Sequence, residues 1–339
     1  MLFNYKRTNH IIDKYHVWIR QMVLDVWCRA STPFLPELLH PDFATIVKEM
    51  PPNYLLNSIE SIHNQLIHKP KSFKNLIGDA FRKNNSIEAL CAGKILPIQY
   101  SEIKVLDKDF ANDLYGFCVS LYDRLSKDDT RIRSSLRGIN DHYKIFFTKG
   151  HNITVCPFCG LVRLLNSYDV NREAYDHYFP KEIYPFNSVN FDNLAPMCHT
   201  CNSKSKSRKD PINLRYGGPR KPVIFPFSAN QTEINVEFQF SKSDVENLTP
   251  IDINLIITSN NSNDEVLQWR EIFKIDSRYK AICCDEAAYN GWLEEYLLMT
   301  TVSDISFDDY LATKEFTPLI NQRFLEAAYL RACDAVNAL

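Results

Sequence analysis

The sequence predicts an α+β protein that is mostly α-helical, with a small metal-organised module in the middle of the chain. Apolar side chains recur at helical spacing through the N-terminal part and again after Asn263. Between these parts the composition changes to paired cysteines, prolines and asparagines, followed by two alternating runs typical of β-strands. We therefore expect a helical N-terminal region over residues 1–150, the module over 151–222, and a β-hairpin-like segment followed by C-terminal helices over 223–339.

The N-terminal region begins with a strongly amphipathic segment, residues 11–28. Its apolar side chains follow the 3.6-residue helical period, which predicts a helix with a broad apolar face. Pro33, Pro36 and Pro41 come next, and because proline has no backbone N–H we expect them to break the helical pattern. Further helical patterns run through 54–66, 72–82, 109–125 and 131–147.

The C-terminal region opens with two predicted strands, INVEFQF and IDINLIIT, which are separated by a turn-rich stretch. The final pattern of the chain has strong helix formers and no helix breaker after its first position. Helical patterns cover residues 264–274, 277–299, 305–313 and 317–338.

Composition limits the class of protein. The chain has 339 residues, of which 45% are hydrophobic and 24% charged, as expected for a globular protein that buries a core. No apolar run approaches the roughly 20 residues of a membrane span, so we expect no membrane partner. The N-terminal residues have no apolar stretch or cleavage site of a signal peptide. We therefore expect a protein of the cytosol or nucleus, and we take cytoplasmic as the working assignment.

Four of the ten cysteines form two Cys-x-x-Cys pairs, Cys156 with Cys159 and Cys198 with Cys201. In a reducing compartment such pairs favour metal binding over oxidation, and four thiolates can surround one Zn²⁺ tetrahedrally. Gly160 follows the first pair and can adopt the positive φ of a tight turn. The sequence therefore predicts a structural zinc site; buried cysteines without metal are the alternative. The remaining cysteines are expected to be small buried apolar side chains.

The net charge of −2 gives no global signature of a nucleic-acid-binding protein, but the basic residues are concentrated in one segment. Basic residues dominate a short stretch after the second cysteine pair, where Asp210 is the single acid. Such a local concentration indicates a phosphate contact. The basic residues are Lys204, Lys206, Arg208, Lys209, Arg215, Arg220 and Lys221.

Between and just after the cysteine pairs the chain carries an ordered set of motif elements: C-x-x-C-G, D-H-x-x-P and N-L-x-P-x-C-x-x-C-N. This set resembles the HNH (ββα-metal) endonuclease superfamily in its four-cysteine zinc form, over roughly residues 153–208. The resemblance implies a zinc-stapled ββα-metal module in which Asn replaces His at the third position of the motif. It also implies hydrolysis of phosphodiester bonds.

The resemblance assigns roles to four residues. His177 is the general base that deprotonates water, and Asp176 and Asn202 hold one catalytic divalent ion, Mg²⁺ or Mn²⁺. Asn193 fixes the loop and orients the base. Two alternatives stay open: Asp176 can instead orient the imidazole, and Asn202 can be a helix N-cap, a role that Asn fills well.

Phosphate contacts are expected from Lys181, Lys204, Lys206 or Arg208. The family pattern has a basic residue three positions after the helix asparagine, whereas this chain has Ser205 there, with a lysine on either side. His199 lies between two zinc cysteines and is expected to face solvent or phosphate.

The function expected from these residues is a metal-dependent HNH endonuclease acting on DNA. The resemblance further implies an effector nuclease of bacterial phage defence that works with a protein partner, such as an ATPase or a sensor subunit. RNA as the substrate, or a non-catalytic zinc module that binds nucleic acid or protein, are the alternatives. The motif does not separate DNA from RNA, because it engages the phosphate and not the base or the 2′-hydroxyl.

Overall fold

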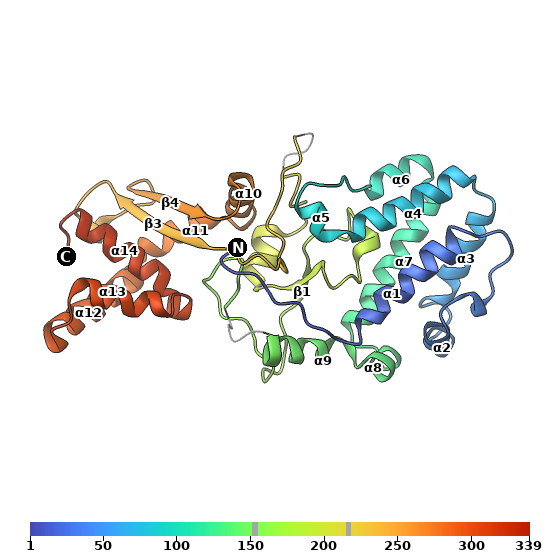
Figure 1. Ribbon diagram of the computed structural model, residues 1–339, viewed down its shortest axis with the longest axis horizontal. Coiled ribbons are helices and arrows are strands. Elements are labelled where there is room, and N and C mark those ends of the chain that lie inside the picture. Colours follow the sequence, from blue (N-terminus) through green and yellow to red (C-terminus); the bar gives the residue numbers. More distant parts are fainter. Residues whose placement is uncertain (151–154, 215–217) are drawn as a thin grey trace.

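The structure is a computed structural model. It describes residues 1–150, 155–214 and 218–339 (Figure 1). Arg215 and the first residues of the predicted module, 151–154, lie outside the described residues. The molecule is elongated: a helical N-terminal lobe occupies one end, a mixed C-terminal lobe occupies the other, and β1 lies between them (Figure 1). The N-terminal segment runs from α1 back to the middle of the molecule.

Helices make up the N-terminal lobe, around a core of large side chains. Trp27 and Phe117 are fully buried, with ring centroids 5.1 Å apart. The predicted helix over 11–28 is confirmed as α1 and a π-helical continuation, η1. The elements are α1 (Asp13–Gln21), η1 (Met22–Trp27), η2 (Pro36–Leu38), α2 (Pro41–Glu49), α3 (Leu56–Ile67), α4 (Lys71–Asn85), α5 (Ile87–Cys91), α6 (Tyr100–Leu106), α7 (Lys108–Ser126), α8 (Thr130–Leu136), α9 (Gly138–Ile145) and η3 (Phe146–Gly150).

Two details of this lobe differ from the expectation. Pro41 starts α2, because the first residue of a helix needs no N–H donor, and the side chain of His40 accepts a hydrogen bond from Asp42 N at 3.3 Å. The helix expected over 131–147 is split into α8 and α9 at Arg137, which has a left-handed φ of 64°. Such a residue ends a regular α-helix.

The middle of the chain contains a short strand, a loop, a second strand and a helix, in that order. β1 (Tyr175–His177) pairs antiparallel with β2 (Leu194–Pro196), so that Asp176 lies opposite Ala195. The 3₁₀ turn η4 (Pro185–Asn187) lies in the loop between them, and the π-helix η5 (Thr200–Lys206) follows β2. The second cysteine pair therefore stands at the start of a helix.

The C-terminal lobe is a two-stranded sheet covered by helices. β3 (Ile234–Phe240) and β4 (Ile253–Ser259) are antiparallel and confirm the two predicted strands. α14 packs on this sheet, and the rings of Phe240 and Tyr329 lie 5.3 Å apart. The remaining elements are η6 (Val245–Asn247), α10 (Asn263–Phe273), α11 (Ile275–Cys283), α12 (Glu286–Ser303), α13 (Phe307–Phe316), η7 (Ile320–Gln322) and α14 (Arg323–Ala335).

Two C-terminal helical patterns differ from the helices that the structure shows. The pattern over 277–299 is divided because Asp285 caps a new helix, accepting a hydrogen bond from Ala288 N at 3.1 Å. The final helix begins only at Arg323, since Asn321 and Gln322 both have positive φ. The predicted fold class, α+β and mostly helical, is confirmed. Among the described residues, none of the helices combines the length and the apolar character that crossing a membrane requires.

Candidate zinc centre and active site

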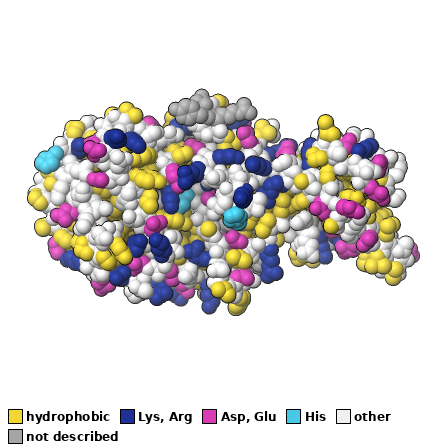
Figure 2. Space-filling view, turned by 180° about the vertical axis from the view of Figure 1, so that it is seen from behind, with side chains coloured by type: hydrophobic (Ala, Val, Ile, Leu, Met, Phe, Trp, Pro, Cys, Tyr) yellow, Lys and Arg dark blue, Asp and Glu magenta, His cyan; other side chains and the backbone are white. Residues whose placement is uncertain are grey.

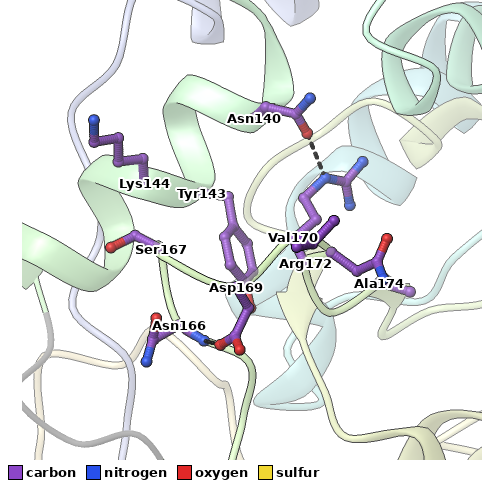
Figure 3. Close-up of a pocket in the computed structure, with 10 residues that line it drawn as sticks. Asn140, Tyr143, Lys144, Asn166, Ser167, Asp169, Val170, Arg172 and Ala174 are labelled. Atoms are coloured by element: carbon purple, nitrogen blue, oxygen red, sulfur yellow. Dashed lines mark hydrogen bonds between the residues drawn. The ribbon is translucent and has the colours of Figure 1, made fainter.

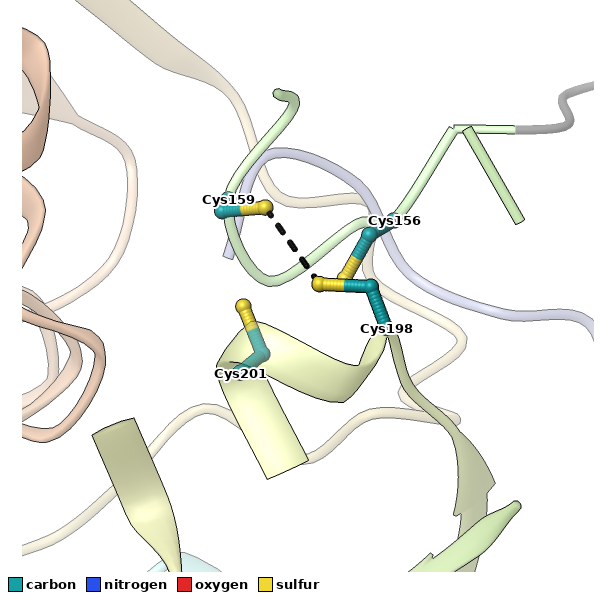
Figure 4. A group of neighbouring side chains, drawn as sticks. All are labelled: Cys156, Cys159, Cys198 and Cys201. Carbon is teal, nitrogen blue, oxygen red and sulfur yellow. Dashed lines mark hydrogen bonds between the residues drawn. The ribbon is translucent and has the colours of Figure 1, made fainter. Parts of the chain in front are cut away.

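The four paired cysteines converge on one point (Figure 4). The Sγ atoms of Cys156, Cys159, Cys198 and Cys201 all lie within 4.8 Å of one another, and all four residues are buried. Tetrahedral zinc with Zn–S bonds of about 2.3 Å needs sulfur atoms roughly 3.8 Å apart. The Sγ atoms of Cys159 and Cys198 are 4.0 Å apart, which is close to that value and far too long for a disulfide. The cluster therefore fits a structural zinc ion.

A tight turn brings the first pair of sulfur atoms together. Gly160 adopts a φ of 69°, and its N–H donates to the carbonyl of Cys156 at 2.7 Å. A Cβ at this position would lie 2.2 Å from Cδ1 of Leu2 and 3.0 Å from Cε1 of Phe324. Glycine is required here both by the backbone conformation and by the close packing of two distant segments.

Both ends of the chain contact this turn. Leu2 N donates to the carbonyl of Pro157 at 2.7 Å. From the C-terminal lobe, Nε1 of Trp269 donates to the carbonyl of Phe158 at 2.8 Å, and the hydroxyl of Tyr279 donates to that of Cys159 at 2.9 Å. The zinc turn is thus the point at which the N-terminal segment, α10 and α11 meet.

Arg278 of α11 places a positive charge against the cysteine cluster. Its Nη1 donates to Sγ of Cys201 at 3.3 Å. A zinc ion with four thiolates carries a net charge of −2, so this guanidinium partly neutralises the centre. Burial lowers the pKa of the Arg278 guanidinium, but the negative charges of the Cys159 and Cys201 thiolates outweigh this effect and raise that pKa above its ordinary value.

A second site lies where η5 leaves the zinc centre. A cavity of about 260 Å³ opens between the end of β1, the segment after it and η5. It brings together most of the residues that the sequence predicted for catalysis. The lining residues are Asp176, His177, Pro180, Lys181, Glu182, Asn202, Ser203, Ser207 and Arg208.

His177 is held in one orientation from two sides. Its Nε2 lies 2.9 Å from the carbonyl oxygen of Ser188. A carbonyl can only accept, so Nε2 carries the proton and Nδ1 keeps the lone pair of the neutral ring. The ring also packs edge-on against Tyr122 of α7, with centroids 4.3 Å apart.

Burial lowers the pKa of His177 to about 3, and the positive charges of Lys181 and Lys206 act in the same direction. The hydrogen bond to the Ser188 carbonyl opposes this shift. The imidazole is therefore neutral near pH 7, which is the state a general base needs.

Asn193 contacts the backbone that follows His177. Its Oδ1 accepts from Phe179 N at 2.7 Å, and its Nδ2 donates to Phe179 O at 3.0 Å. Tyr178 N donates to the backbone carbonyl of Asn193 at 2.9 Å. The side chain is fully buried, and it lies outside the cavity. Its position is that of a residue that fixes the loop.

Asp176 is paired with a buried lysine. Nζ of Lys206 lies 2.8 Å from Oδ2 of Asp176 and donates to the backbone carbonyl of His177 at 2.7 Å. Burial raises the pKa of Asp176, and the Lys206 ammonium opposes that shift. The ion pair therefore favours the carboxylate form in a poorly hydrated position.

Asn202 lies in the first turn of η5 and lines the cavity. Its N–H donates to the Cys198 carbonyl at 2.9 Å, and its own carbonyl accepts from Ser207 N at 2.7 Å, an i to i+5 bond typical of a π-helix. The amide side chain and the carboxylate of Asp176 thus line one cavity, although they come from different elements.

The predicted phosphate-contact residues divide into two groups. Lys204 and Arg208 are exposed, and Nζ of Lys181 lies 4.6 Å from the ring centroid of Tyr122. Lys206, in contrast, is 1% exposed, and its ammonium forms the ion pair with the carboxylate of Asp176. His199 is exposed, as expected. Figure 2 shows several Lys and Arg side chains close together over the middle of the molecule.

The sequence did not indicate several residues around the cavity. Glu182 adds a carboxylate to its wall, and Tyr122 and Ser188 position the histidine. Tyr122 belongs to a helix that precedes the module, and the role of Ser188 lies in its backbone, so no local motif identifies either of them. Glu182 follows directly on the predicted Lys181, but its side-chain direction depends on the folded loop.

A larger cavity, of about 530 Å³, lies between α9 and the segment that leads into β1 (Figure 3). In this cavity Nε of Arg172 donates to Oδ1 of Asn140 at 2.8 Å. The other guanidinium nitrogens of Arg172 donate to backbone carbonyls of Ser126 and Glu173. None of the predicted site residues lines this cavity, so the smaller one is the candidate active site.

No protein-family model, curated protein or solved structure matches this chain.

Proposed function

We propose that the protein is a metal-dependent endonuclease of the HNH type that hydrolyses phosphodiester bonds of DNA. The observation that carries this proposal is the single small cavity shared by Asp176, His177 and Asn202, directly beside a four-cysteine cluster. Asp176 and His177 lie on β1, and Asn202 lies on η5, the helix that follows β2. The ββα-metal resemblance implies the same order of elements.

His177 acts as the general base in this proposal. Its Nδ1 holds the lone pair, because Nε2 donates to the Ser188 carbonyl, and Nδ1 accepts the proton of the attacking water. The carboxylate of Asp176 and the amide oxygen of Asn202 would hold Mg²⁺ or Mn²⁺, which prefer such oxygen ligands. When bound, that ion supplies Lewis acidity at the scissile phosphate.

The zinc centre has a separate role. Four thiolates fill the coordination sphere of a tetrahedral zinc ion, so this centre leaves no open position for water or phosphate. We assign it to folding, because it fixes the start of η5 and with it the position of Asn202.

Exposed basic residues of the segment that lines the cavity support an anionic substrate. Arg208 lines the cavity, and the exposed Lys204 and Lys209 lie close to it in the sequence. Positive charge at this place attracts the phosphate backbone of a nucleic acid. The place of the enzyme in phage defence, with an ATPase or sensor subunit as partner, is proposed from the family resemblance alone.

The test is cleavage of supercoiled plasmid, single-stranded DNA and RNA with Mg²⁺ or Mn²⁺. His177→Ala is expected to lower the rate by about 100-fold to 10,000-fold, the usual contribution of a general base. Zinc content should stay close to that of wild type, because His177 lies outside the cysteine cluster. His199→Ala is the matched control, since this histidine is exposed in the same module, and it should cleave at the wild-type rate.

Equal cleavage by wild type and His177→Ala would remove the proposed base. Activity confined to the RNA substrate would keep the mechanism and replace DNA as the substrate. Absence of cleavage by wild type on every substrate, while specific binding remains, would favour a non-catalytic zinc module.

A further inference from the structure

Lys206, the last residue of η5, is buried directly behind the candidate active site. The side chain is 1% exposed, and its Nζ lies 2.8 Å from Oδ2 of Asp176 and 2.7 Å from the carbonyl oxygen of His177. The neighbouring Lys204 and Arg208 point to solvent. A lysine is almost never fully buried unless its charge is paired, so these two contacts account for its position.

The π-helical form of η5 explains why this lysine reaches Asp176. An i to i+5 turn contains one more residue than an α-helical turn, and the Ser207-to-Asn202 hydrogen bond shows such a turn. The additional residue moves Lys206 toward the side of the helix on which an α-helix would place Ser205. Ser205 is the position at which the family pattern has its basic residue. The helix form thus compensates for a one-residue shift in the sequence.

The geometry points to Lys206 as a positioning residue of the active site, not a phosphate contact. Its ammonium holds Oδ2 of Asp176, which leaves Oδ1 as the oxygen that can serve as a ligand in the cavity. The same ammonium holds the backbone carbonyl of His177, and so fixes the end of β1 that carries both residues. This inference rests on the proposed nuclease function.

The two roles predict different consequences for binding and cleavage. A phosphate contact contributes to DNA affinity, and its loss reduces the salt dependence of binding by about one unit of slope. A positioning residue that faces the protein interior leaves affinity and slope unchanged and affects the turnover number. Removing a positive charge next to Asp176 also removes a repulsion on any cation that Asp176 binds.

The experiment compares Lys206→Met with Lys71→Met, which changes an exposed lysine at the start of α4, outside the cavity. For Lys206→Met we expect kcat at saturating Mn²⁺ to fall at least 100-fold, with KM for DNA and the salt slope within twofold of wild type. We expect Mn²⁺, titrated without DNA and followed by electron paramagnetic resonance, to bind at least tenfold more tightly. Lys71→Met should keep the wild-type kcat and Mn²⁺ affinity, because Lys71 does not line the cavity.

Three results would overturn the inference: a wild-type kcat in Lys206→Met, a reduced salt slope of DNA binding, or an unchanged or weaker Mn²⁺ affinity. If Lys206→Met does not retain zinc, Lys206→Gln replaces it with the same expectations, because the amide keeps a hydrogen-bond donor. If wild type binds Mn²⁺ but does not cleave, the nuclease proposal fails and the Mn²⁺ affinities alone decide the inference. If wild type binds no Mn²⁺, the inference is overturned.

Discussion

Single residues around the zinc cluster act through charge as well as through packing. Arg278 is the clearest case, because its guanidinium donates to Sγ of Cys201 across the boundary between the module and the C-terminal lobe. Groups that hydrogen-bond to metal ligands tune the metal, and their loss commonly costs 10-fold to 100-fold in affinity.

Arg278→Met is therefore expected to release zinc more readily. A chelator competition should show an affinity about 10-fold lower than that of wild type. Lys280→Met, on the same helix, is the control, since Lys280 contacts only the carbonyl of Pro250 among the contacts that the structure shows. Equal zinc affinity in the two variants would contradict a role for the guanidinium.

At this scale the sequence predicted which residue types gather at the site, and the structure adds how they are held. The cysteines, Asp176, His177 and Asn202 stand in a local pattern, so their proximity could be anticipated. The Ser188 carbonyl and the ring of Tyr122 could not, because they reach His177 through tertiary folding. The inward direction of the Lys206 side chain could not be predicted either, because it depends on the additional residue in the π-helical turn of η5.

Short elements are positioned here by turns with special backbone geometry. The turn after Cys159 depends on Gly160, with a φ of 69° and no room for a Cβ between Leu2 and Phe324. A left-handed conformation costs an ordinary residue about 1–2 kcal/mol, and overpacking adds a comparable amount.

Gly160→Ala should lower the free energy of unfolding by about 2–3 kcal/mol in urea titration. Gly116→Ala is the matched control: Gly116 lies within α7, and a Cβ there meets nothing within 4 Å. Because alanine is the better helix former, this second change should stabilise the protein by up to about 1 kcal/mol. Equal effects of the two changes would show that the turn tolerates a side chain.

Zinc removal should loosen particular elements and spare others. Without the ion, β1, β2 and η5 lose the link between the two cysteine pairs, whereas the N-terminal helices keep their own core. Hydrogen exchange after chelation is expected to speed up by about 10-fold or more in residues 175–206. Protection in α3 and α7 should change little; equal loss in these helices would indicate that zinc supports the whole fold.

Element boundaries were less predictable than element types. The long apolar patterns identified most helices and both longer strands, because tertiary packing follows the same periodicity. Breaks occurred where a residue adopts a positive φ, as at Arg137 and Gln322, and neither residue type signals such a conformation. The sequence patterns did not predict α2, which begins at Pro41.

Across the whole molecule, buried histidines link stability to pH. Burial lowers the pKa of His142 to about 3 and that of His16 to about 4. Nδ1 of His142 lies 2.5 Å from the hydroxyl of Tyr175, within hydrogen-bond distance. Between the lowered pKa and the unfolded value near 6.5, the unfolded chain binds more protons than the folded one. The contribution of these two histidines to the free energy of unfolding is therefore present above about pH 6.5 and is lost as the pH falls below that value.

We expect His142 alone to cost about 2 kcal/mol of unfolding free energy at pH 5 relative to pH 7.5. His142→Gln removes this titration, so its loss of stability between the two pH values should be smaller by about that amount. His68→Gln, at an exposed position, should behave as wild type. The measurement is urea denaturation with zinc present at both pH values, and identical pH dependence in all three proteins would contradict the assignment.

The turn at Cys156–Gly160 also determines whether residues 151–222 can be separated from the rest of the chain. Phe158 is fully buried, with its ring 5.0 Å from that of Phe273, and the backbone of the turn bonds to Leu2, Trp269 and Tyr279. An excised fragment of residues 151–222 would expose this apolar surface and lose those partners. The segment over residues 151–222 is therefore not separable from the rest of the chain: grafted onto another protein, it would need a host that rebuilds the contacts now made by the N-terminal segment, α10 and α11.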